Sequence, residues 1–217
     1  GVSGNGWINS EMANELVRLG EQRIAAFPYE FLVRAALDLD PTNMFLALYR
    51  CLEATYAFVR ARDLATKLGI AHSWVDVAKA VGETLSWYPR HDQSLSAVLG
   101  LAAVERNDLV SLATALGKPI AGDELASKVA SAVRELRNSL VHYGPTTEPV
   151  DLNRDWNELC VPLARLVGSV FAHAYGSVGV TSAGSGAQRD LRDRASRPSK
   201  APKVTGVGRG VKLRIPV

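Results

Sequence analysis

Apolar residues recur at steps of three or four along most of the first 180 positions, and this periodicity predicts helices rather than strands. A first helix is expected to end near Phe27-Pro28, with its apolar face formed by Leu16, Leu19, Ile24 and Phe27. A long helix is predicted from about Pro41 to Leu68, because Asp40-Pro41 is a typical helix start and Gly69 a typical stop. At about 1.5 Å per residue, it would span roughly 40 Å.

Shorter helices are expected in the middle of the chain. One covers about Ser73 to Trp87, and a turn follows at residues 89–92. One or two more helices cover Leu95 to Leu116 and stop at Gly117 and Pro119.

Two strongly patterned helices close the predicted bundle. The first begins at Asp123 and stops at Gly144-Pro145, and its apolar stripe consists of Leu125, Val129, Ala132, Leu136 and Leu140. The last runs from about Asn153 to Tyr175, with Trp156, Leu159, Leu163, Leu166 and Val170 on one side. Pro162 is expected to kink this helix or delay its start. The pattern therefore predicts an all-α, antiparallel bundle of about five to seven helices.

The composition changes at Thr181 to Gly, Ser, Pro and basic residues, which predicts a flexible tail over residues 181–217. The tail carries nine basic and two acidic residues, a net +7, so residues 1–180 carry −4 of the overall +3. The tail is either a solvated extension or an RNA-binding arm. Residues 1–9, which begin without methionine, are expected to be a linker or a cloning remnant, and residues 10–180 the helical domain of what could be a larger protein.

Several functional classes are disfavoured by the sequence. No apolar run reaches the roughly 18–20 residues that a membrane span needs, and no signal peptide is visible, so a cytoplasmic location is expected. Cys51 and Cys160 lie in apolar helical patterns and are interpreted as buried free thiols. No cluster of His, Cys, Asp and Glu has metal-ligand spacing, so neither a metal nor another cofactor is predicted.

The candidate chemistry lies in Arg137-Asn138-Ser139-Leu140-Val141-His142. An arginine can hold a phosphate and a histidine can move a proton near neutral pH. On a helical wheel Arg137 and His142 lie about 140° apart and flank an outer face with apolar Val141 at its centre. An apolar residue there suggests that another helix or subunit covers this face. The other three histidines lack an arginine at this spacing; His72 and His91 are interpreted as capping or surface residues, and His173 as a packed or surface one.

This string resembles the signature of the HEPN superfamily, an arginine followed after four to six residues by a histidine, often with a polar residue after the arginine. It is most similar to the version in bacterial defence and toxin proteins, including the ApeA-like group. The segment from Phe45 to Glu53 is also similar to the long helix of that family, which often carries a Leu-Glu pair after an aromatic residue. The resemblance covers about residues 10–180.

The resemblance implies a bundle that dimerises around one cleft and cleaves RNA without a metal, as the toxin or effector of an antiviral defence system. His142 would act as the general base toward the ribose 2′-hydroxyl or as the acid toward the leaving oxygen. Arg137 would bind the scissile phosphate, and Asn138 would orient His142 or the phosphate. Expected partners are RNA, a second copy of the chain, and a sensor domain of a larger protein or an antitoxin. The alternative is a non-catalytic HEPN-like module for dimerisation or partner binding.

Overall fold

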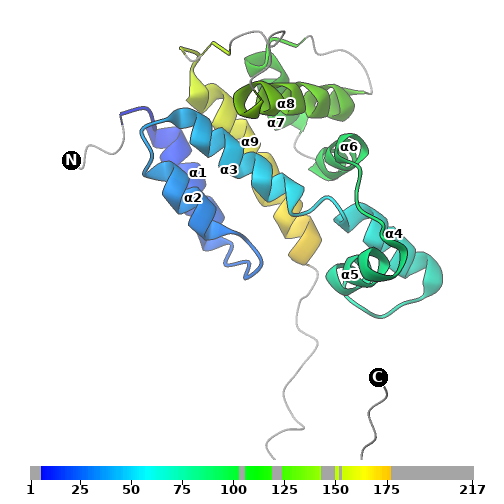
Figure 1. Cartoon of the computed structure of the whole chain (residues 1–217). Coiled ribbons are helices and arrows are strands. Elements are labelled where there is room, and N and C mark those ends of the chain that lie inside the picture. Colours follow the sequence, from blue (N-terminus) through cyan, green and yellow to red (C-terminus); the bar gives the residue numbers. More distant parts are fainter. Residues whose placement is uncertain (1–5, 103–105, 119–123, 143–149, 152, 177–217) are drawn as a thin grey trace, which may run out of the picture. The chain divides into compact units, whose positions relative to one another are not determined.

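The computed structural model describes residues 6–102, 106–118, 124–142, 150–151 and 153–176 (Figure 1). These residues form helices and no strand, so the predicted all-α helical bundle is confirmed. The helices are α1 (Ser10–Glu21), α2 (Tyr29–Ala36), α3 (Pro41–Glu53), α4 (Phe58–Leu68), α5 (Trp74–Leu85), α6 (His91–Leu101), α7 (Arg106–Ala115), α8 (Leu125–Val141) and α9 (Trp156–Tyr175). The predicted tail, residues 181–217, lies outside the described residues, as do Asp123, Gly144 and Pro145.

The central helix of the fold is α9, which packs against α1, α3, α6 and α7. Its predicted stripe is buried, and so are residues on its other sides, which explains why it reads as apolar all round. Asp155 caps the helix by accepting a hydrogen bond from the Asn157 N–H at 2.8 Å. The helix begins at Trp156 and continues through Pro162, so of the two expected effects of the proline, a kink or a delayed start, the delayed start does not occur.

The predicted long helix is wrong in one respect that matters for the candidate site. Instead of running from Pro41 to Leu68, it is divided at residues 54–57 into α3 and α4, which part visibly in Figure 1. The Thr55 hydroxyl is fully buried and donates to the Leu52 carbonyl at 2.8 Å, while the Tyr56 N–H bonds to Glu53 instead. A buried hydroxyl must find a partner, and here it takes the carbonyl that would have continued the helix.

The N-terminal helices also differ from the prediction. Helix α1 ends at Glu21 rather than near Phe27, because Arg23 adopts a left-handed backbone with φ +50°. Phe27 still reaches the core from the loop and is 4% exposed. Helix α2, which the pattern did not single out, follows and packs against α3.

The hairpin of α4 and α5 has a small core of its own, formed by Ala61, Ala65 and Val77. Its attachment to α9 includes the Trp74 indole N–H, which donates to the Ala174 carbonyl at 2.9 Å. None of the described helices is long and apolar enough to cross a membrane.

An ion-pair network ties α1, α7 and α9 together. The Arg165 guanidinium contacts Glu15 at 2.9 Å, Glu11 at 2.8 Å and Asp108 at 3.5 Å. Burial raises the pKa of Glu15, but hydrogen bonds from Arg165 and Arg18 more than offset this, so the pKa is lowered overall. A lowered pKa means that folding is stabilised while this carboxylate is charged, and that the stabilisation is lost as the pH falls through the folded-state pKa.

Glu15→Gln is therefore expected to lower the free energy of unfolding by about 1–3 kcal/mol near pH 7, with a smaller loss in acid, where the wild-type carboxyl is also neutral. Denaturant unfolding followed by circular dichroism at neutral and acidic pH measures this. Glu30→Gln is the control, because the Glu30–Arg34 pair is exposed and contributes only about 0–1 kcal/mol. Equal effects of the two substitutions at both pH values would contradict the prediction.

Candidate functional site

The arginine and the histidine of the motif contact each other within a single subunit. Arg137 extends from α8, and its Nη1 lies 3.2 Å from Nε2 of His142. The same nitrogen donates to Oδ1 of Asn138 at 3.2 Å. The three predicted site residues therefore form one cluster, in which Arg137 is partly buried and the other two are exposed.

This contact corrects the geometry expected from the helical wheel. Helix α8 ends at Val141, so His142 is not in the last helical turn but is the capping residue, with an extended backbone at φ −110° and ψ 116°. Its N–H still donates to the Asn138 carbonyl at 2.8 Å. Because a wheel applies only to helical residues, the 140° separation overestimated the distance between the two side chains.

The contact fits one arrangement of hydrogen-bond roles. A guanidinium only donates hydrogen bonds, so a hydrogen bond between these two atoms has Nε2 as its acceptor, which corresponds to the imidazole tautomer with its proton on Nδ1. Since the imidazole is exposed, a lone pair on Nε2 can take up a proton from a bound molecule.

A buried tyrosine contacts the guanidinium, and a second buried tyrosine contacts the first. The Cζ atom of Arg137 lies 5.8 Å from the centre of the Tyr49 ring, a cation–π distance. The Tyr56 hydroxyl donates to the Tyr49 hydroxyl at 3.2 Å, and the two residues are 5% and 2% exposed. Burial, followed by the Tyr49 contact, raises the pKa of Tyr56, whereas Arg137 lowers it. Tyr56 therefore stays protonated and serves as a support.

A carboxylate and a second imidazole complete the cluster. The Oε1 atom of Glu53, at the end of α3, lies 3.7 Å from Nδ1 of His91, at the start of α6. The His91 ring meets the Tyr56 ring edge-on, with 5.6 Å between centroids. His91 is a surface residue, as predicted, but it is also part of this cluster.

Four residues of the cluster were not recognised as site residues from the sequence: Tyr49, Glu53, Tyr56 and His91. Tyr49, Glu53 and Tyr56 share an i, i+4, i+7 spacing in the sequence, but Tyr56 lies in the turn after α3, so this spacing alone does not place it beside Tyr49. No spacing rule could have placed His91 beside them, since the contact depends on how α6 packs against the end of α3.

The surface beside the motif includes an exposed apolar residue. Val141 is 48% exposed and lies between Asn138 and His142 in sequence, in agreement with the outer face expected for it. The cluster thus offers a cation of the type that can bind a phosphate and an imidazole that can accept a proton, and an exposed apolar residue precedes His142 in the sequence.

Catalysis by a cysteine nucleophile or by a bound metal ion has less support among the described residues. Cys51 and Cys160 are buried free thiols, as predicted, and burial raises the pKa of Cys51 to about 12, so neither is suited to act as a nucleophile. Across the described ranges, no group of three or more His, Cys, Asp or Glu side chains could hold a metal ion.

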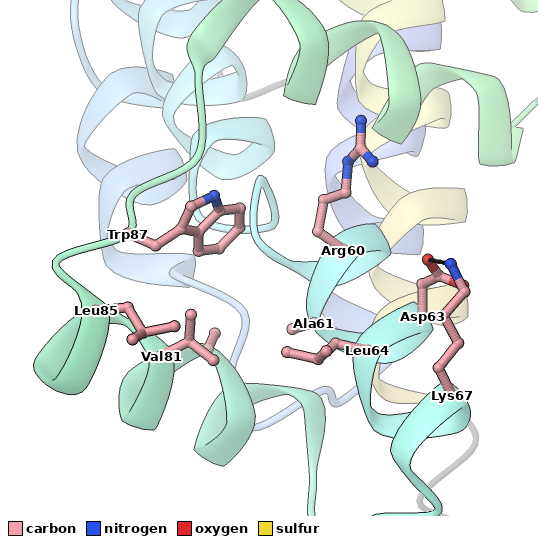
Figure 2. A pocket seen from close by; sticks show the side chains of 9 residues that line it. Arg60, Ala61, Asp63, Leu64, Lys67, Val81, Leu85 and Trp87 are labelled. Carbon is pink, nitrogen blue, oxygen red and sulfur yellow. Dashed lines mark hydrogen bonds and ion pairs between the residues drawn. The ribbon is translucent and has the colours of Figure 1, made fainter.

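A separate hollow lies between α4 and α5, where Leu85, Val81 and Trp87 face Ala61 and Leu64 (Figure 2). Its volume is about 460 Å³, and its charged rim includes the Lys67–Asp63 pair at 2.9 Å. The described lining is mainly apolar and includes no histidine or cysteine, so the Arg137 cluster is the stronger candidate for chemistry.

Comparison of the chain with protein-family models, curated proteins and solved structures gave no match.

Proposed function

We propose that this chain is a metal-independent endoribonuclease of the HEPN type. The observation that carries the proposal is the contact between Arg137 and His142, which puts a phosphate-binding fork and a proton acceptor side by side at the surface. Such a pair can start RNA cleavage without a metal, because the nucleophile is the 2′-hydroxyl of the substrate itself.

The reaction follows from the atoms present. The scissile phosphate binds the Arg137 guanidinium, which replaces its contact with His142 and releases Nε2. That nitrogen removes the 2′-hydroxyl proton, and the 2′-oxygen forms a bond to phosphorus as the bond to the 5′-oxygen breaks. Arg137 stabilises the additional negative charge on the phosphate. Asn138, which accepts from Arg137, orients the fork. The products are a 2′,3′-cyclic phosphate and a 5′-hydroxyl, once a proton reaches the leaving oxygen.

The biological setting is proposed from the motif resemblance. The chain acts in the cytoplasm on RNA, as the toxin or effector of a defence system, and is controlled by a sensor domain of a larger protein or by an antitoxin. Residues 1–180 carry a net charge of −4, so the excess of positive charge that would attract RNA comes from the basic residues of 181–217.

A homodimer is also proposed, with the cluster at its interface. The exposed Val141 beside the polar motif supports this, because burying an apolar side chain favours association. Light scattering is expected to give twice the chain mass of 23.3 kDa. A monomer mass at micromolar concentration would contradict the dimer.

The proposed activity is tested by incubating the purified chain with labelled RNA in excess EDTA. Cleavage is expected to persist, because no step uses a metal, and the 3′ ends are expected to be cyclic phosphates. Mass spectrometry of the fragments identifies those ends. Cleavage that EDTA abolishes, or fragments with 3′-hydroxyl ends, would contradict the mechanism.

A non-catalytic HEPN-like module is the second candidate, and one observation favours it. A net charge of −4 on residues 1–180 is unusual for a protein that holds RNA, whereas a protein-binding surface has no such requirement. Under this alternative, RNA remains intact in the same assay.

A further inference from the structure

The proposed reaction needs a second proton-transfer group, and the same subunit contains a candidate. The leaving 5′-oxygen must be protonated while His142 removes the 2′-hydroxyl proton. A series of contacts connects His142 to Arg137, Arg137 to the Tyr49 ring, Tyr49 to Tyr56, and Tyr56 to the His91 ring. His91 therefore belongs to one continuous group of side chains drawn from α3, α6 and α8 and the turn that follows α3.

The surroundings of the two imidazoles differ in charge. His142 faces the Arg137 guanidinium, which requires an unprotonated Nε2 in this arrangement. His91 has the Glu53 carboxylate 3.7 Å from its Nδ1, so a proton on that nitrogen faces a negative charge. A carboxylate beside an imidazole orients the ring and provides a counterion when the ring is positively charged. The side chain of His91 is 67% exposed, so the ring is open to solvent.

We propose that His91, oriented by Glu53, is the general acid of this cleavage, and that it acts with His142 of the same subunit. The inference rests on the proposed ribonuclease function. Nε2 of His91 gives its proton to the 5′-oxygen as the phosphorus–oxygen bond breaks, while Nε2 of His142 gains the proton of the 2′-hydroxyl. The net transfer is one proton, and exchange with water restores both rings.

Two neighbouring groups are less suited to the role. The Tyr56 hydroxyl is buried and directs its proton to Tyr49. The Glu53 side chain is 27% exposed and is the group that holds His91, so we assign it as a positioning residue.

A change of leaving group tests the general acid directly. The substrates are an oligonucleotide with one ribonucleotide and the same oligonucleotide with sulfur in place of the bridging 5′-oxygen. A thiolate is the conjugate base of a group with a pKa near 8.5 and leaves without protonation, unlike an alkoxide. His91→Gln is expected to slow cleavage of the oxygen substrate by about 10²–10⁴-fold, and to cleave the sulfur substrate at a rate close to wild type.

Two further variants serve as comparisons for His91→Gln. Glu53→Gln is expected to show the same pattern with a smaller loss, and His72→Gln, at an exposed histidine outside the cluster, is expected to behave as wild type on both substrates. Equal losses by His91→Gln on the two substrates, or wild-type rates on both, overturn the inference while leaving the ribonuclease function intact. Failure of the wild-type chain to cleave either substrate overturns the ribonuclease function and this inference together.

The claim that one subunit supplies both groups has its own test. Each subunit in a mixture of His91→Gln and His142→Ala chains lacks one of the two imidazoles. The mixture is therefore expected to remain as inactive as either variant alone. Recovery of activity on mixing would show that the two histidines come from different subunits, and would overturn this part of the proposal.

Discussion

RNA cleavage is expected to fall by about 10²–10⁴-fold in His142→Ala, because that substitution removes the proposed general base. Arg137→Ala is expected to cost about 10²–10³-fold, since a group that stabilises charge in the transition state is lost. Arg137→Lys should recover little of this loss, because an ammonium group cannot replace the fork that donates to Asn138 and faces His142. Initial rates on a labelled oligonucleotide in EDTA measure all three effects.

Controls must separate chemistry from folding. His142 is exposed, so His142→Ala is expected to change the free energy of unfolding by less than about 0.5 kcal/mol. Arg137 also contacts the Tyr49 ring, which contributes about 0.5–2 kcal/mol, so thermal melts of both alanine variants should accompany the rates. Arg60→Ala and His173→Ala, at exposed positions outside the cluster, should cleave as wild type. Wild-type rates in His142→Ala would contradict its assignment as the base.

The largest effect on stability is expected for Phe171→Ala in α9. The Phe171 side chain is fully buried, and its ring lies 4.5 Å from that of Phe27 and 5.5 Å from that of Tyr175, between centroids. Truncating a buried phenylalanine removes its transfer free energy and leaves a cavity, so the free energy of unfolding is expected to fall by about 3–5 kcal/mol. Denaturant unfolding measures the change.

Phe31→Ala is the matched control for this substitution. Phe31 is 47% exposed, and Arg50 lies 5.9 Å from its ring centre, so its loss is expected to cost about 1 kcal/mol or less. A loss at Phe171 no larger than that at Phe31 would show that α9 is not the centre of the core.

Helix positions could be predicted where the apolar spacing in the sequence matches the side of the helix that is buried in the structure. The apolar stripe of α8 and that of α9 were predicted because a helix that buries one side repeats its apolar residues every three or four positions. The division between α3 and α4 was not predictable in this way, because the apolar spacing continues across it. The break depends on the burial of the Thr55 hydroxyl, which only the packed structure produces.

The sequence by itself determined the all-α class and indicated Arg137, Asn138 and His142 as a candidate set, because both depend on residue type and on spacing along the chain. Tertiary structure decided which other residues join that set. The turn after α3 places Tyr56 against Tyr49, the packing of α6 places His91 beside Glu53, and the extended backbone of His142 brings its ring to the guanidinium. These contacts join residues distant in sequence or depend on where a helix ends, so periodicity contains no record of them. The Arg137-to-His142 motif therefore indicates where the candidate site lies, and tertiary packing brings the other residues of the cluster to it.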